Sequence, residues 1–225
     1  GVLGLDINAD HLAVSETDRF GNVIHARRID CQTRGKTTSG RQAVIGDAVR
    51  QVIDWACVVK KPIALEKLDF RKKKAESEKN GEHYNRMLSG FAYAQIQALL
   101  QARAFDAGIE IMRVNPAYTS IIGQHKFAQR YGLSSHQAAA LAIARRTTRL
   151  CEKLPRQLYG TLPLSVRNER KHVWSLWAKV LRSSRTMHAA LRKSRRRGKN
   201  SASNSILPAR SSRDGPVCDL LPAGW

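Results

Sequence analysis

Two carboxylates stand where a strand pattern makes a charge costly. Asp6 lies inside the alternating apolar segment 1–8, and Glu66 directly ends the apolar run 63–65. A charge within a core strand is unfavourable unless it is paired or binds a metal. If the two strands are neighbours, both carboxylates meet at one edge of the sheet and share divalent ions. The pattern indicates a metal site, with a salt-bridged Asp6 and an ordinary strand-end Glu66 as the alternative.

The chemistry of such a site follows from its ligands. Hard cations such as Mg²⁺ prefer oxygen ligands and keep several waters for substrate phosphates. In two-metal sites the ions lie about 3.5–4 Å apart, one activating water and the other stabilising the leaving oxygen. The two carboxylates therefore favour a hard divalent cation, Mg²⁺ (or Mn²⁺), as cofactor beside substrate phosphates.

Composition points to a polyanionic partner. The chain has 225 residues with 39 Lys and Arg against 18 Asp and Glu, a formal charge of +21, and 42% hydrophobic residues. That charge favours nucleic acid as the partner, with a merely soluble basic surface as the alternative. No apolar run approaches the roughly 20 residues of a membrane span, so no membrane partner is expected. The four cysteines form no C-x-x-C pair, which favours a reducing cytoplasm.

Hydrophobic periodicity predicts the elements that must position the two carboxylates. Three short strands open the chain, and helices then alternate with strands. The order β-β-β-α-β-α-β-α predicts a mixed α/β sheet covered by helices. The predicted strands are 1–8, 11–17, 23–29, 63–65 and 109–114, and the predicted helices are 40–58, 85–107 and 134–150.

The C-terminal part is basic and weakly patterned. Residues 145–225 hold 19 of the Lys and Arg residues but only four acids. A basic amphipathic helix is predicted over 170–194, with Trp174 and Trp177 inside. The Ser-, Pro- and Arg-rich end buries too little to offset its ordering entropy. The predicted organisation is a domain over 1–150, a basic helical extension over 151–194 and a disordered tail over 195–225.

Four stretches resemble motifs of the RuvC-like nucleases in the TnpB/OrfB transposon-associated family. They are GLDINADHLAV at 4–14, ALEKLDFRKKK at 64–74, RVNPAYTSIIG at 113–123 and SSHQAAALAIARR at 134–146. The resemblance implies an RNase H-like fold and an RNA-guided, Mg²⁺-dependent DNA endonuclease of transposon origin. It also implies a DNA target, a guide RNA and a cytoplasmic, nucleoid-associated protein of a bacterium or archaeon.

The third motif departs from the family pattern. Where the family usually has an Asp before the alanine-rich helix, this chain has His136, and no acid lies between Glu110 and Glu152. Imidazole can ligate a metal or move protons. The resemblance therefore implies Asp6, Glu66 and His136 as catalytic and metal-binding residues. The alternative is that His136 only caps or packs the helix, in a weakened or dead site.

Two further departures concern whole segments. Residues 115–134 contain no Cys, so the family's zinc ribbon is not expected here. The family's N-terminal recognition portion also has no counterpart, which implies a fragment or a reduced branch. This departure and His136 favour the alternative function, a nucleic-acid-binding relative acting as a guided repressor or a decayed transposon remnant.

Basic and aromatic residues near the predicted site favour nucleic-acid contacts. The basic loop after Glu66 is expected to bind phosphates, unless it is only a solvated charged loop. Tyr118, after Asn115, is expected to stack on a base or to fill the core. The remaining histidines, His11 among them, show no metal-ligand spacing and receive no role. The predicted nucleic-acid-binding residues are Arg71, Lys72, Lys73, Lys74, Asn115 and Tyr118.

A reading from another class starts from the same first strand. The segment GLDIN at 4–8 also resembles the phosphate-facing strand of actin-like sugar kinases. Those enzymes need Gly-rich phosphate turns and a second α/β half to enclose ATP. The 15 glycines here are dispersed, and the second half of the chain is basic and weakly patterned. The kinase interpretation is therefore the least favoured of the three.

Overall fold

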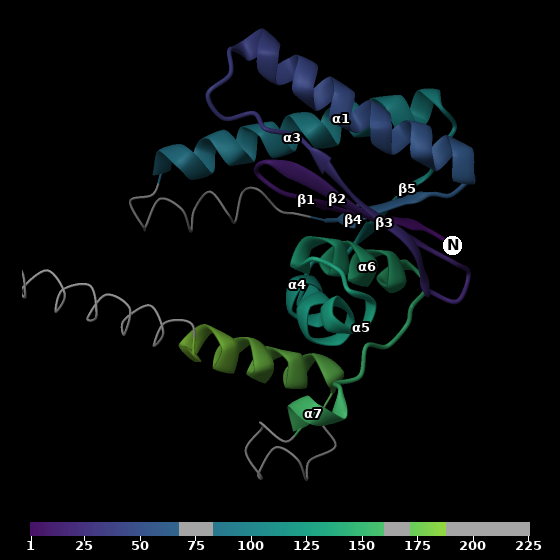
Figure 1. The fold of residues 1–225 in the computed structure, drawn as a ribbon, viewed down its shortest axis with the longest axis vertical. Coiled ribbons are helices and arrows are strands. Elements are labelled where there is room, and N and C mark those ends of the chain that lie inside the picture. The colour runs from purple at the N-terminus through teal and green to yellow at the C-terminus, as the bar shows by residue number, and fades with distance from the viewer. Residues whose placement is uncertain (68–82, 160–171, 188–225) are drawn as a thin grey trace, which may run out of the picture. The chain divides into compact units, whose positions relative to one another are not determined.

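The computed structural model describes residues 1–67, 83–159 and 172–187. Apart from 183–187, these residues belong to one compact unit, Gly1–Arg182. The unit contains a five-stranded mixed sheet with strand order β3-β2-β1-β4-β5 (Figure 1). The mixed α/β fold predicted from the sequence is thereby confirmed. Several predicted features lie outside the described residues: Arg71, Lys72, Lys73, Lys74 and the tail 195–225.

The central strand of the sheet comes first in the chain. β1 (Leu3–Ile7) pairs antiparallel with β2 (His11–Thr17), which pairs antiparallel with β3 (Val23–Asp30). On its other side β1 runs parallel to β4 (Ile63–Glu66), and β4 runs parallel to β5 (Ile111–Val114). Parallel neighbours need crossover connections, and helices supply them here.

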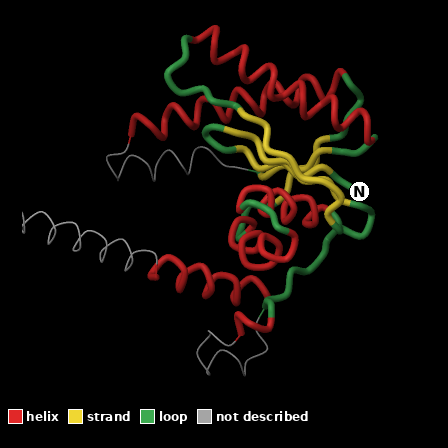
Figure 2. The backbone as a smooth tube through the Cα atoms, viewed as in Figure 1, coloured by secondary structure: helices red, strands yellow, loops and turns green. Residues whose placement is uncertain are grey.

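Two long crossover helices cover one face of the sheet. α1 (Thr38–Val59) connects β3 to β4, and α3 (His83–Asp106) precedes β5 (Figure 1). Figure 2 shows the strands between these helices and the helices of the opposite face. Because side chains alternate along a strand, Leu3 and Leu5 of β1 both face α1 and α3. They belong to the main core cluster, together with Leu12, Val14, Ile45, Val49, Val52, Ile63, Leu65, Ile96 and Leu100.

Small residues let α6 (Ser135–Thr147) pack closely on the other face. A Cβ atom built on Gly4 would lie 1.9 Å from the carbonyl oxygen of Ala140, so only glycine fits there. The alanines of α6 are all buried. Ser134 and Gln137 form a capping box at the start of the helix, which fixes where its first turn stands.

Residues 119–131, which the sequence analysis left without an element, are helical. They form α4 (Thr119–Ile122), a π-helical turn η1 (Gly123–Ala128) and α5 (Gln129–Tyr131). A Cβ atom on Gly123 would lie 2.5 Å from the backbone nitrogen of Ala139, so this segment also packs tightly on α6. The irregular winding explains why a regular helical period was not visible in the sequence.

The described residues between 151 and 182 belong to the same unit. The short helix α7 (Arg156–Tyr159) is followed by a helix over 173–187, in which Trp177 is fully buried against the α4–α6 cluster. Trp174, expected inside, is 39% exposed. No helix among the described residues is long and apolar enough to cross a membrane. The predicted domain boundaries at 150 and 194 stay predictions.

Candidate active site

Strand register brings Asp6 and Glu66 to the same end of the sheet. The parallel pairing of β1 and β4 ends with Leu5 opposite Leu65, and the two carboxylates follow directly on their strands. Side-chain alternation places Asp6 on the same face as Gly4, which is the face that α6 covers. Two carboxylates far apart in the sequence thus stand at the same end of two adjacent parallel strands.

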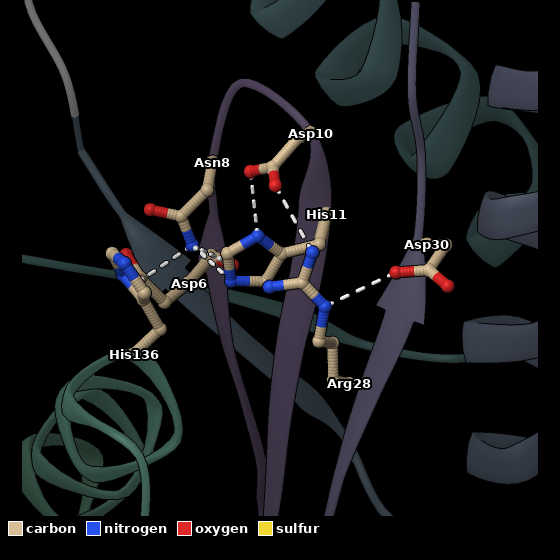
Figure 3. A network of polar contacts seen from close by, with 7 residues as sticks. All are labelled: Asp6, Asn8, Asp10, His11, Arg28, Asp30 and His136. Atoms are coloured by element: carbon tan, nitrogen blue, oxygen red, sulfur yellow. Dashed lines mark hydrogen bonds and ion pairs between the residues drawn. The ribbon is translucent and has the colours of Figure 1, made fainter.

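The Asp6 carboxylate accepts two hydrogen bonds on one oxygen. His136 Nδ1 lies 3.1 Å from Asp6 Oδ2, and Asn8 Nδ2 lies 3.0 Å from the same atom (Figure 3). The Asp6 side chain is 16% exposed. Among the described residues, no hydrogen bond reaches Asp6 Oδ1.

The contact with Asp6 assigns the His136 tautomer. A carboxylate only accepts, so His136 Nδ1 carries the hydrogen and donates it. In a neutral ring Nε2 then carries the lone pair. Because the His136 side chain is 46% exposed, Nε2 is accessible to a proton, a water or a metal. The structure therefore brings His136 together with Asp6 as predicted.

Glu66 is oriented by Thr119. The Thr119 hydroxyl donates to Glu66 Oε1 and lies 3.0 Å from the carbonyl oxygen of Pro116. Both Glu66 and Asp6 also act on Tyr93 of α3. Burial raises the pKa of Tyr93 above its usual range, and the negative charges of Glu66 and Asp6 raise it further. One phenol thus senses both carboxylates.

The sequence analysis missed a polar network behind Asp6. His11, the first residue of β2, is 4% exposed and holds Asp10 at 2.7 Å through Nδ1. Its ring centroid lies 4.8 Å from that of His136, with the ring planes at 76°. Asn8 Nδ2 lies 3.4 Å from His11 Nε2. The available signal was a histidine at the first position of the predicted strand 11–17, directly after Asp10.

Asp10 is tied to the edge strand. Arg28 of β3 contacts Asp10 at 3.0 Å and Asp30 at 3.1 Å (Figure 3). Hydrogen bonds from His11 and then Arg28 hold the pKa of Asp10 below its ordinary value. Asp10 therefore remains an ionised acceptor for His11 at neutral pH.

Asn115 and Tyr118 lie beside Glu66 in a turn held by Arg146. The Asn115 side chain accepts from the backbone nitrogen of Ala117 at 2.9 Å, and Arg146 donates to the carbonyls of both residues. Tyr118 is half-buried at φ 65°, with its ring 6.2 Å from that of Trp174. Contacts of Asn115 and Tyr118 with nucleic acid stay predictions.

The donor set fits a hard divalent cation in ligand chemistry. Two carboxylates on adjacent strands supply oxygen ligands, and Asp6 keeps one oxygen without a hydrogen bond in the described part of the chain. Within the described residues, no three His, Cys, Asp or Glu side chains are already grouped as metal ligands. Side-chain adjustment at Asp6, Glu66 or His136 would accompany cation binding.

Proteins similar to this chain are found among solved structures. No protein-family model and no curated protein matches the chain. Two solved structures of Thermus thermophilus RuvC are similar, each covering 64% of this chain and 89% of its own. RuvC in complex with a Holliday junction substrate has 18% identity and a TM-score of 0.46. A second RuvC structure has 17% identity and a TM-score of 0.41. At these identities and TM-scores, the two RuvC structures carry no argument about the reaction of this chain. Any catalytic chemistry has to be derived from its own side chains.

Proposed function

We propose that this chain is the nuclease part of a metal-dependent DNA endonuclease of the RNase H-like type. The observation that carries the proposal is the placement of Asp6 and Glu66 on adjacent parallel strands, with His136 hydrogen-bonded to Asp6. The charge of +21 supports a nucleic-acid substrate. Asp6, Glu66 and His136 are the proposed catalytic residues.

Each side chain has a distinct part in this mechanism. Asp6, through Oδ1, and Glu66 would hold Mg²⁺ or Mn²⁺, with His136 as a further ligand or a proton carrier. When bound, such a cation supplies water activation and neutralisation of the phosphate charge. Thr119 keeps Glu66 oriented through its hydroxyl. His136 Nε2 accepts a proton while Nδ1 stays hydrogen-bonded to Asp6.

The finer proposal is a TnpB-like, RNA-guided endonuclease associated with a transposon. Four stretches that resemble family motifs occur in the family's order, which supports it. Pairing with a guide RNA would then read the DNA target, and the protein would read shape and charge. The basic loop with Arg71–Lys74, together with Asn115 and Tyr118, is proposed to contact the nucleic acid.

The test compares matched neutralising variants of the full chain. We expect Asp6→Asn and Glu66→Gln to abolish Mg²⁺- or Mn²⁺-dependent cleavage of DNA by the protein purified with its bound RNA. Asp30→Asn makes the same chemical change on the exposed edge strand and should cleave like the parent. Circular dichroism establishes that all variants are folded. Undiminished cleavage by Asp6→Asn would remove the metal assignment.

A second candidate function is a nucleic-acid-binding relative without cleavage. The observation that favours it is His136 at the position where the resembled motif has an acid. The His136→Asp variant separates the two functions. If it cleaves DNA and the parent does not, the parent is a binding protein. If the parent cleaves and His136→Ala does not, His136 serves the nuclease.

A further inference from the structure

We infer that His11, oriented by Asp10, is a positioning residue that keeps Asn8 and His136 on Asp6. The described contacts of His11 are with Asp10, Asn8 and His136, and its effect on Asp6 passes through the last two side chains. The inference rests on the proposed function only where it concerns metal binding. The geometry itself consists of contacts among described residues (Figure 3).

Asp10 fixes the tautomer of His11. Asp10 Oδ1 lies 2.7 Å from His11 Nδ1, and an ionised carboxylate accepts only, so Nδ1 carries the hydrogen. His11 Nε2 then carries a lone pair. Asn8 Nδ2 lies 3.4 Å from this nitrogen. Asp10 therefore makes Nε2 of His11 a hydrogen-bond acceptor.

The acceptor on His11 fixes the orientation of the Asn8 amide. The same Asn8 nitrogen that faces His11 Nε2 donates to Asp6 Oδ2 at 3.0 Å. If His11 carried its hydrogen on Nε2, two donors would oppose each other. Rotating the Asn8 amide would relieve that conflict but would turn its oxygen toward the Asp6 carboxylate. The tautomer set by Asp10 is thus the one that allows Asn8 to hold Asp6.

The ring of His11 also restrains His136. The two rings meet edge to face, with centroids 4.8 Å apart, and His11 is almost fully buried. The His136 side chain is 46% exposed, so the buried ring of His11 restricts its movement on one side. This contact favours the orientation in which His136 Nδ1 donates to Asp6 Oδ2.

Both donors act on the same atom of Asp6. Asn8 and His136 hold Oδ2, which leaves Oδ1 without a hydrogen bond in the described part of the chain. Groups that support a ligand from behind typically change metal affinity by about 10- to 100-fold when removed. His11 and Asp10 support the two donors and not the carboxylate itself. We therefore expect an effect at the lower end of that range.

The experiment has two readouts on the full chain. Long-range ¹H–¹⁵N spectra identify the tautomers of His11 and His136, and titration with Mn²⁺ alone measures metal affinity. In the parent, both histidines should show hydrogen on Nδ1. In Asp10→Ala, His11 should shift toward the Nε2–H form, the His136 signal should change, and Mn²⁺ affinity should fall about tenfold. Asp30→Asn, which also loses a contact with Arg28, should leave both readouts unchanged.

Substitution of His11 itself provides a rescue test. His11→Ala should lower Mn²⁺ affinity, while His11→Gln should restore part of it, because the Gln side-chain oxygen can accept from Asn8. Thermal melting checks that each variant is folded. If Asp10→Ala and His11→Ala leave both the His136 tautomer and Mn²⁺ affinity unchanged, the positioning role is wrong.

The two readouts separate failure of this inference from failure of the proposed function. If the folded parent binds no Mn²⁺ but the His136 tautomer still responds to Asp10→Ala, positioning is correct and the metal assignment fails. If the parent binds Mn²⁺ and neither readout responds to the variants, the metal site stands and positioning fails.

Discussion

Gly4 of β1 and Ala140 of α6 approach so closely that a Cβ atom on Gly4 would lie 1.9 Å from the Ala140 carbonyl oxygen. His136 lies about one turn before Ala140, and Asp6 lies two residues after Gly4, on the same face of its strand. The close approach therefore sets the distance over which His136 reaches Asp6. Packing at one glycine and chemistry at the carboxylate are coupled.

Gly4→Ala should both destabilise the protein and weaken the site. The added methyl group overlaps helix backbone, which cannot rotate away, so we expect a loss of about 3 kcal/mol in the free energy of unfolding. Urea unfolding measures this loss. Gly46→Ala is the control. Gly46 lies within α1, and among the described residues its Cβ would meet only the Arg103 side chain of α3, at 3.8 Å. That variant should gain about 0.5–1 kcal/mol. An unaltered stability of Gly4→Ala would contradict the tight packing.

Thr119→Val should impair the site with little effect on stability beyond one lost hydrogen bond. The variant keeps the shape of the side chain but cannot donate to Glu66. By the usual effect of groups that orient metal ligands, Mn²⁺ affinity should fall about tenfold. Titration with Mn²⁺ measures it. Thr119→Ser retains the hydroxyl and should stay close to the parent, whereas equal losses in both variants would point to packing instead.

The alkaline titration of Tyr93 reports on both carboxylates. Because burial and the charges of Glu66 and Asp6 raise its pKa, its tyrosinate absorbance should appear above the usual range near about 10. Glu66→Gln removes one negative charge and should lower this pKa. Tyr93→Phe identifies the signal among the five tyrosines. An unchanged pKa of Tyr93 in Glu66→Gln would contradict the effect of the Glu66 charge on Tyr93.

The raised pKa of Tyr93 also predicts how stability changes with pH. A phenol whose folded pKa is raised keeps its proton in the folded state, while the unfolded chain releases it first. The ionisation of Tyr93 therefore leaves the free energy of unfolding unchanged below about pH 10. It lowers that free energy as the pH rises beyond this value. The parent should lose more unfolding free energy than Tyr93→Phe over that alkaline range, as measured by urea unfolding at successive pH values.

Glu152→Gln should destabilise the unit that contains the site. Glu152 is buried and pairs with both Lys126 of η1 and Arg145 of α6. Removing its charge leaves two mostly buried cations without their partner, and we expect a loss of about 3 kcal/mol on urea unfolding. The exposed Glu110 is the matched control, and Glu110→Gln should change stability by less than about 0.5 kcal/mol. Equal stabilities of the two variants would refute the role of Glu152.

The sequence was sufficient for the carboxylate pair because two rules combine there. Apolar alternation located the strand that carries Asp6, a short apolar run located the strand that Glu66 ends, and the ends of parallel strands align in a sheet. The mixed α/β class followed from the order of the same elements. His136 came from a resemblance between short motifs, since no spacing along the chain relates it to Asp6.

The rest of the site depends on contacts that periodicity does not encode. His11 lies at the start of a strand that follows a turn. Its role beside the site depends on α6, which brings His136 against its ring. Thr119 reaches Glu66 from a segment whose π-helical winding hides its period. Trp174 carries an apolar signature, yet it is partly exposed next to Arg146. Such residues acquire their surroundings from tertiary structure alone.

The position of β1 has a consequence for how the protein is made. β1 is synthesised before β4 and α6, and it can pair early with β2, its neighbour in the sequence. Its parallel partner β4 and the helix α6 arrive much later, and such nonlocal contacts form slowly. A chain still emerging from the ribosome thus holds Asp6 at an unpaired strand edge. The proposed metal-binding residues come together only once α6 has left the exit tunnel and closed over the sheet.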